Sequence, residues 1–199
     1  MRCTAQQQQE NREAIFVAAR RLFKESGYAA VGIDAIAQSA GLTSGALYSQ
    51  YPSKQVLFEA VLEAELLDFP RRWLGRAAQS APDWWQQLVA GYLGKRHLNN
   101  AAGGCVLPSL SVDAARGGEA TQQIYEDALL EAVDALAQVI PGASDLTPRE
   151  TVWSMLALLA GAIMLARATR TKAVAAEILE ACRTLALQVS ATQPPQGAA

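Results

Sequence analysis

The sequence predicts an all-α fold, in which an N-terminal three-helix head with a helix-turn-helix precedes a C-terminal helical bundle. Apolar residues recur at i, i+3, i+4 and i+7 along most of the chain, a periodicity that predicts about nine helices. Hydrophobic residues make up 51% of the 199 residues, and strand signals are scarce. This composition is typical of one or two compact helical domains with a sizeable core.

The first helix is predicted from about Glu10 to Gly27. Residues 1–9 contain a glutamine run that offers nothing to bury, so we expect a disordered lead there. The helix has one apolar stripe: Ile15, Ala18, Ala19, Leu22 and Phe23. Four cations lie off this stripe: Arg12, Arg20, Arg21 and Lys24. We interpret them as solvated surface charge, with phosphate contact by one or two of them as the alternative.

Residues 32–54, GIDAIAQSAGLTSGALYSQYPSK, predict two short helices joined by a tight turn. The first has a buried face of residues at helical spacing: Ile33, Ile36, Ala37 and Ala40. Gly41 can adopt the left-handed backbone that ends this helix. Thr43 can cap the second helix, and Pro52 ends it. Such a pair is the helix-turn-helix of DNA-binding proteins, whose second helix enters the major groove.

The second short helix has a smooth outward face. With Leu47 buried, 100° per residue places Gly45 and Ser49 on the opposite side, flanked by Ala46 and Tyr48. Small residues let the main chain approach base edges, and the hydroxyls supply hydrogen bonds.

A third helix is predicted to start directly after the pair. Ser53 can cap it, and its first N–H groups together with the Lys54 ammonium can hold a phosphate.

The stretch AGLTSGALYSQYPSKQVLFEAVL resembles the recognition region of the tetracycline-repressor-like (TetR/AcrR) transcriptional regulators. The residues that carry the resemblance are in the family's register: Gly41, Leu47, Tyr48, Tyr51, Ser53, Lys54, Leu57 and Phe58, preceded by Ala18, Ala19, Leu22, Phe23, Gly27, Tyr28, Ile36 and Ala37. Beyond residue 60 the resemblance is limited to the helical layout. It implies a DNA-binding domain over residues 10–54 and a ligand-binding and dimerisation domain over residues 55–190.

This resemblance and the outward face define the candidate DNA contacts: Gly32, Thr43, Ser44, Gly45, Ala46, Tyr48, Ser49, Gln50, Tyr51 and Lys54. Thr43, Tyr48 and Lys54 are expected to hold phosphates. The residues expected to face bases are Ser44, Gly45, Ser49 and Gln50. Family members usually have Thr or Ser where this chain has Gly32, so that hydroxyl is missing and a backbone N–H is the remaining candidate for the contact.

Counting the helix that starts at Ser53, six helices follow the pair in the sequence-based prediction: 53–79 with a kink at Pro70, 83–98, a short one within 103–117, 119–139, 147–169 and 171–189. Thr147, Pro148 and Glu150 form a capping-box pattern at the start of the fifth. Residues 191–199 are expected to be a disordered tail.

The last two helices are apolar nearly all round, which favours a homodimer interface over residues of about 147–189. Burial within one subunit is the alternative. Several side chains could line a pocket for a small apolar or aromatic ligand: Trp73, Trp84, Trp85, Tyr92, Cys105, Trp153 and Met155. Ordinary core packing is the alternative for each of them.

Charge and cysteine usage limit the possible functions. The net charge is −2, and residues 1–60 have six basic and five acidic side chains, so DNA affinity would depend on a few placed contacts. Three cysteines without a CxxC pattern indicate reduced thiols in a cytoplasmic protein. No secretory signal is evident, and the apolar run 152–166 is shorter than the roughly 18–20 residues of a membrane span. We therefore expect no membrane association.

No cofactor or metal is expected, because one histidine leaves too few nitrogen ligands for zinc. His97 and Cys105 lack a third orienting group, so we do not expect an enzyme. The predicted function is a sequence-specific DNA-binding transcriptional regulator, a ligand-responsive repressor that binds a palindromic operator as a dimer. Two alternatives remain: a small-molecule-binding helical protein without DNA binding, and a thiol-based redox or electrophile sensor acting through Cys105.

Overall fold

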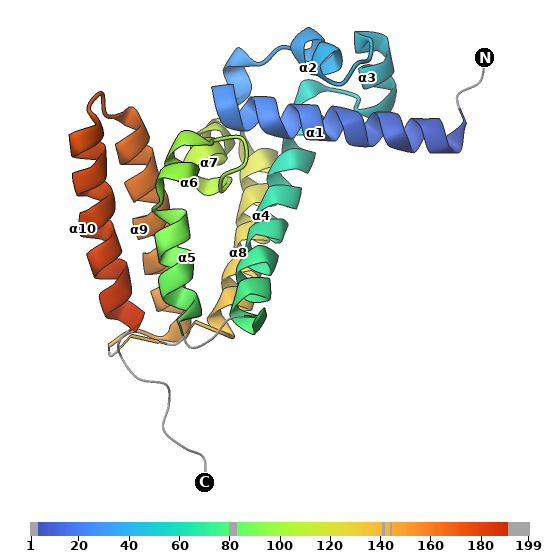
Figure 1. Ribbon diagram of the computed structural model, residues 1–199. Coiled ribbons are helices and arrows are strands. Elements are labelled where there is room, and N and C mark those ends of the chain that lie inside the picture. Colours follow the sequence, from blue (N-terminus) through green and yellow to red (C-terminus); the bar gives the residue numbers. More distant parts are fainter. Residues whose placement is uncertain (1–3, 80–82, 141, 144, 191–199) are drawn as a thin grey trace. The chain divides into compact units, whose positions relative to one another are not determined.

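The computed structural model describes residues 4–79, 83–140, 142, 143 and 145–190, and over these residues the protein is all-helical (Figure 1). The described residues form ten helices: α1 Ala5–Ala30, α2 Ile33–Ser39, α3 Ser44–Gln50, α4 Lys54–Gln79, α5 Trp84–Tyr92, α6 Lys95–Asn99, α7 Leu107–Arg116, α8 Glu119–Ala137, α9 Pro148–Ala168 and α10 Lys172–Ser190. The predicted fold class is confirmed. The predicted tail 191–199 lies outside the described residues.

Helix α1 starts at Ala5, earlier than the predicted start at Glu10. Thr4 caps it, because its hydroxyl accepts a hydrogen bond from the Gln7 N–H at 3.2 Å. On the helix surface, side-chain amides of the glutamine run donate hydrogen bonds to residues one turn later. Nε2 of Gln6, for example, donates to Oε1 of Glu10 at 3.0 Å. Residues 5–9, predicted as part of a disordered lead, are therefore helical although they bury nothing.

The backbone of α1 bends at Gly27, where φ is 79° and ψ is 163°. A side chain would strain this left-handed region, so glycine is the residue suited to the bend. Before it, the predicted stripe is buried at Ile15, Ala18, Ala19 and Phe23. The predicted end of the regular helix at Gly27 thus appears as a bend followed by a last short turn to Ala30.

The chain divides into two compact units, and the division does not follow sequence order. One unit takes the described residues of Met1–Glu65 and Ala101–Glu126, and the other takes those of Leu66–Asn100 and Asp127–Ala199. Helix α7 therefore belongs to the same unit as the helix-turn-helix, and it packs against α1.

The core of the first unit contains packed aromatic rings and a buried ion pair. Phe23 of α1 meets Phe58 of α4 edge to face, with ring centroids 5.5 Å apart. Beside them, Nζ of Lys24 lies 2.5 Å from Oε2 of Glu65, and the two side chains are 2% and 3% exposed. The interpretation of Lys24 as solvated surface charge is therefore wrong, because Glu65 from α4 supplies a buried carboxylate.

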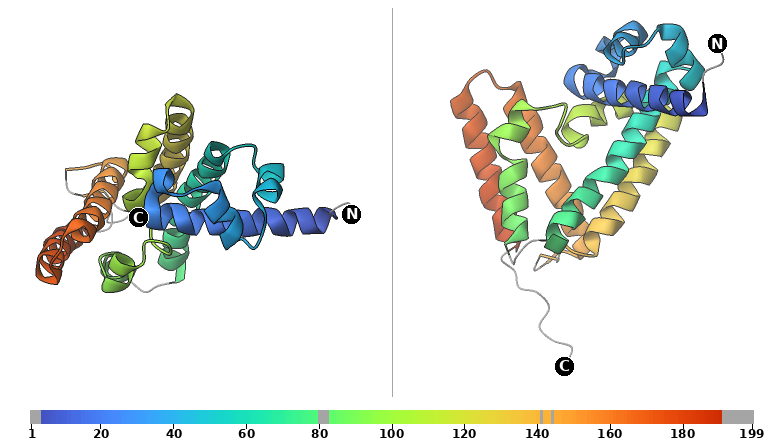
Figure 2. Two further views of the ribbon diagram at one scale, coloured as in Figure 1. Left: turned by 90° about the horizontal axis from the view of Figure 1, so that it is seen from above. Right: turned by 45° about the vertical axis from the view of Figure 1, so that its right-hand side comes forward.

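The second unit is built around α9 and α10, which lie side by side (Figures 1 and 2). The capping box at the start of α9 is confirmed: the Thr147 hydroxyl accepts from the Glu150 N–H, and the Glu150 carboxylate accepts from the Thr147 N–H. A hydrogen bond connects α5 to α10: Nε1 of Trp85 donates to the Ala186 carbonyl oxygen at 3.1 Å.

The predicted helix 83–98 is divided into α5 and α6. Gly94 lies between them with an extended backbone, φ −89° and ψ 160°, and acts as the N-cap of α6. A Cβ on Gly94 would lie 2.9 Å from the Ala90 carbonyl oxygen, so the chain packs closely on itself there.

By length and composition α9 could cross a membrane, although 44% of its most apolar window is buried inside the protein, as in the core helix of a globular domain.

Candidate nucleic-acid interface

The turn between α2 and α3 has the predicted geometry. Gly41 has a φ of 71°, and the Leu42 N–H returns to the Ala37 carbonyl at 2.9 Å, which closes the end of α2. The Thr43 hydroxyl accepts from the Ala46 N–H at 3.2 Å and so caps α3. Gly32 is the N-cap of α2 with no side-chain hydrogen bond, and its own main chain is exposed.

Side-chain hydrogen bonds fix the short helices against each other and against α1. The Ser44 hydroxyl donates to Oδ1 of Asp34 at 2.5 Å, joining α3 to α2. Arg21 of α1 donates to the Ser39 hydroxyl at 2.9 Å, at the end of α2. The proton of Ser44 is thus used within the motif, and its oxygen lone pairs remain for accepting hydrogen bonds.

Helix α3 buries one side and exposes a face of small and polar residues. Leu47 is fully buried, whereas Tyr48 is 52% exposed and Gly45 and Ser49 are also exposed. A Cβ on Gly45 would meet no atom closer than Thr43 Oγ1 at 3.9 Å, so space lies in front of this glycine. The Ser49 hydroxyl donates to the Ala46 carbonyl at 2.6 Å, which leaves its lone pairs outward. The half-buried Ala46 and Gln50 flank this face.

Tyr51, which the sequence places among the candidate contacts, is only 3% exposed. The guanidinium of Arg12 lies 4.5 Å from the centre of its ring, and Nη1 of Arg12 donates to the Gln50 carbonyl at 3.0 Å. Burial raises the pKa of Tyr51, and the nearby Arg12 charge opposes that rise. Tyr51 is therefore packed at the end of α3, and the Arg12 guanidinium lies over its ring.

Lys54 begins α4 and lies over an aromatic ring. Its Nζ is 4.2 Å from the centroid of Tyr28. Burial lowers the pKa of Lys54, and the carboxylate of Asp113 raises it. The Ser53 hydroxyl accepts from the Val56 N–H at 3.1 Å, so the predicted cap of this helix is confirmed.

Three residues that shape this region, Arg12, Tyr28 and Asp113, are absent from the candidate set drawn from the sequence. Tyr28 carries part of the family resemblance, which was the available signal. Asp113 gave none, because its partner lies 85 residues away in the chain.

The candidate ligand-contacting residues include two aromatic pairs in the second unit. Trp73 meets Tyr92 edge to face at 5.8 Å, and Trp84 meets Trp85 at 5.7 Å. Met155 is buried and Trp153 is 36% exposed. Cys105 belongs to the first unit, whereas the other candidates belong to the second.

His97 belongs to the second unit and Cys105 to the first. His97 is half-buried, with Nδ1 2.7 Å from the Tyr92 carbonyl oxygen. Among the described residues, no group of three or more His, Cys, Asp or Glu side chains could hold a metal ion.

Residues 15–61 match the family described as bacterial regulatory proteins, tetR family. Over 62 residues the chain is 39% identical to the HTH-type transcriptional regulator AcrR of Shigella flexneri, and the match spans 31% of this chain and 29% of that protein.

Two solved structures share the fold over nearly the whole chain. The TetR-family transcriptional regulator from Agrobacterium tumefaciens has a TM-score of 0.74 and 17% identity, covering 89% of this chain and 98% of its own. The TetR-family regulator from Cytophaga hutchinsonii has a TM-score of 0.71 and 19% identity, covering 92% and 96%. Residues 15–61, which contain the helix-turn-helix, are thus similar to the tetR family of bacterial regulatory proteins, and the chain shares its overall fold with these two structures.

Proposed function

We propose that this protein is a ligand-responsive transcriptional repressor that binds a palindromic DNA operator as a homodimer. The observation that carries the proposal is the face of α3. Leu47 anchors the helix, while Gly45, Tyr48 and Ser49 stand exposed on a surface that a major groove can accept.

In this proposal phosphates and bases are contacted by different residues. Thr43, Tyr48 and Lys54 hold phosphates, with the main chain of Gly32 as a further phosphate contact. Base edges face Ser44, Gly45, Ala46, Ser49 and Gln50. The hydrogen bonds that Ser44 and Ser49 donate within the motif make their oxygens acceptors toward DNA, which favours the amino groups of adenine or cytosine. Tyr51 contributes by anchoring α3.

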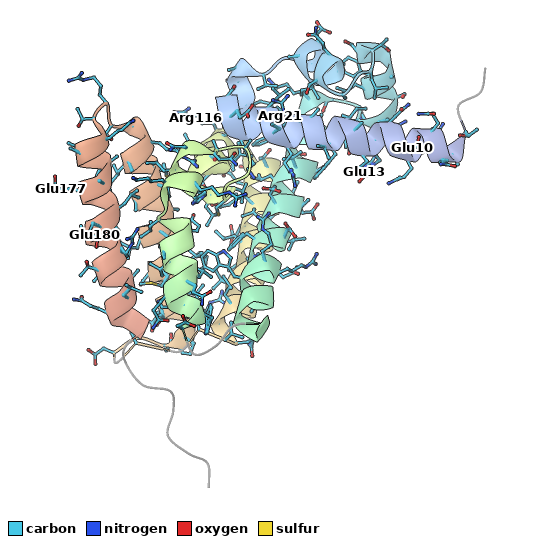
Figure 3. All side chains as sticks on the ribbon, in the orientation of Figure 1. Glu10, Glu13, Arg21, Arg116, Glu177 and Glu180 are labelled. Atoms are coloured by element: carbon cyan, nitrogen blue, oxygen red, sulfur yellow. The ribbon has the colours of Figure 1, made fainter. Side chains whose placement is uncertain are left out.

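The proposed homodimer forms through residues of about 147–189. Apolar side chains are exposed on both of the last helices: Trp153, Met164 and Leu165 on α9, and Val174 and Leu185 on α10. Leu165 is 61% exposed. Figure 3 shows Glu177 and Glu180 projecting outward from α10. A second copy related by a two-fold axis would cover the same residues on both subunits.

The proposed ligand is a small apolar or aromatic molecule held in the second unit. Trp73, Trp85, Tyr92 and Met155 are buried there and would supply aromatic and thioether walls for such a ligand. The proposed location is the cytoplasm, where the three cysteines would stay reduced.

The central experiment selects genomic fragments with the purified protein and measures binding of the selected duplex as salt is varied. Lys54→Ala should weaken binding to every sequence by a similar factor and reduce the salt slope by about one. Ser49→Ala and Gln50→Ala should instead change the preference at particular base pairs. An equal loss across all operator variants for the three substitutions would contradict the assigned roles.

A second experiment tests the dimer. Leu165→Glu should convert the protein to a monomer in analytical ultracentrifugation, because it places two charges against the apolar face of the partner. Val17→Glu is the matched control, since Val17 of α1 is 50% exposed outside the proposed interface. A Leu165→Glu protein that remains dimeric would exclude this interface.

The two alternatives make different predictions. A ligand-binding protein without DNA binding would select no duplex, including the region upstream of its own gene. A thiol sensor would lose its response in Cys105→Ser, although the buried position of Cys105 makes its thiol poorly accessible to oxidants.

A further inference from the structure

A carboxylate from α7 lies against the bend at the end of α1. The main-chain N–H of Tyr28 donates to Oδ2 of Asp113 at 3.1 Å. Gly27 precedes Tyr28 with a φ of 79°, and a Cβ built on it would lie 3.4 Å from the same oxygen. Asp113 therefore fixes the direction in which Tyr28 leaves the bend, because a carboxylate–amide hydrogen bond is directional and stronger than a neutral one.

Tyr28 in turn supports Lys54. Its ring packs against Phe58 at 4.8 Å and Phe23 at 5.9 Å between centroids, so the core holds one side of the ring. The Lys54 ammonium lies 4.2 Å from the centroid of Tyr28. Lys54 and Phe58 are one turn apart on α4, so a single tyrosine ring connects the core to the first residue of that helix.

We infer that Asp113 is a positioning residue for DNA binding: it fixes the Gly27–Tyr28 bend, and through the Tyr28 ring it holds the Lys54 ammonium at the phosphate-binding start of α4. The inference rests on the proposed function, in which Lys54 contacts a phosphate. It adds to the DNA-reading head a residue that lies more than fifty positions beyond it in sequence, on a helix that packs against α1.

Charge and positioning make opposite predictions for the loss of Asp113. A negative charge near Lys54 reduces its attraction for phosphate, so removal of that charge alone would strengthen binding. If the carboxylate positions Lys54, its removal weakens binding instead. The sign of the effect therefore separates the two roles.

The test measures operator affinity by fluorescence anisotropy over a series of salt concentrations, with the duplex selected by the wild-type protein. Asp113→Ala should weaken binding by about fivefold and lower the salt slope by about one. Asp113→Asn keeps an acceptor oxygen for the Tyr28 N–H and should stay within about twofold of wild type. Glu63→Ala is the matched control, because it removes an exposed carboxylate from α4 of the same unit.

A double-mutant cycle with Lys54→Met distinguishes positioning from a general loss of stability. In the Asp113→Ala background, Lys54→Met should have little further effect, since the ammonium is already displaced. If Asp113→Ala loses its helical circular dichroism, Tyr28→Leu takes its place in the same cycle, because it removes the ring and keeps the main-chain hydrogen bond.

Two results would overturn the inference alone: Asp113→Ala binding as tightly as wild type with an unchanged salt slope, or Lys54→Met costing the same factor in both backgrounds. A wild-type protein that binds no duplex would overturn the proposed function and this inference with it.

Discussion

Replacement of Lys24 by methionine should destabilise the protein strongly, because it leaves the buried Glu65 carboxylate without its ammonium partner. At 2.5 Å the gross attraction in the Lys24–Glu65 pair is about 6–7 kcal/mol for an effective dielectric constant of about 20. Burial of both charges cancels much of it, so the pair adds little net stability. Breaking a buried pair, however, costs about 3–5 kcal/mol.

The remaining interactions place the expected loss toward the lower end of that range. Arg20 lies 3.4 Å from Oε1 of Glu65 and can compensate part of its charge. Methionine also keeps most of the apolar stem of lysine in place. The double substitution Lys24→Met with Glu65→Leu removes both buried charges, and its stability should return to within about 1.5 kcal/mol of wild type.

The assay is urea unfolding followed by circular dichroism at one fixed protein concentration, so that association contributes equally to every variant. Arg72→Met is the control, because it breaks the Arg72–Asp68 pair, in which both side chains are more than 40% exposed. It should cost less than about 0.5 kcal/mol. A Lys24→Met variant as stable as this control, or a double variant that loses the sum of both single losses, would refute the reasoning.

Three further predictions concern the helix-turn-helix region, residues 10–54, and the start of α9. Arg12→Met should lower the ratio of operator to non-specific affinity about threefold with an unchanged salt slope, because Arg12 clamps the end of α3; a slope reduced by about one would assign it to a phosphate. Gly41→Ala should lower the free energy of unfolding in urea by about 1–2 kcal/mol, because Gly41 has a φ of 71°. Gly45→Ala, within a helix, should raise the free energy of unfolding by about 0.5–1 kcal/mol. The added methyl group should nevertheless weaken operator binding. Thr147→Ala should cost about 1 kcal/mol at neutral pH. Hydrogen bonds from Thr147 lower the pKa of Glu150, so the stability that they contribute is present above the ordinary glutamate pKa and is lost as the pH falls through the lowered pKa. The difference in unfolding free energy between wild type and Thr147→Ala should therefore shrink in acid. A difference that does not change with pH would exclude this coupling.

Local signals in the sequence were reliable where one residue and its near neighbours decide the structure. The left-handed Gly41 and the caps at Thr43 and Thr147 were predicted because each acts within about four residues. The break at Gly94 was missed, since glycine inside an apolar helical pattern is compatible with continuation, whereas in the structure its backbone is extended and caps α6.

Contacts between distant residues account for the rest of the differences. The sequence placed Lys24 on a polar face of α1, and nothing near it indicated that Glu65, 41 residues later, would be buried beside it. Tyr51 was expected at the DNA because its family motif borders the recognition helix, while packing under Arg12 buries it.

The sequence by itself determined the all-α class, the helix-turn-helix with its outward face of small residues, and the similarity of residues 15–61 to the tetR family, because periodicity, caps and motif each depend on neighbouring residues. The tertiary structure decided which polar groups are buried and which helices support the reading head. It placed the Asp113 carboxylate against the Tyr28 N–H, a pairing set by how α7 packs on α1. Such pairings depend on the summed packing of whole helices, so no single stretch of sequence contains them.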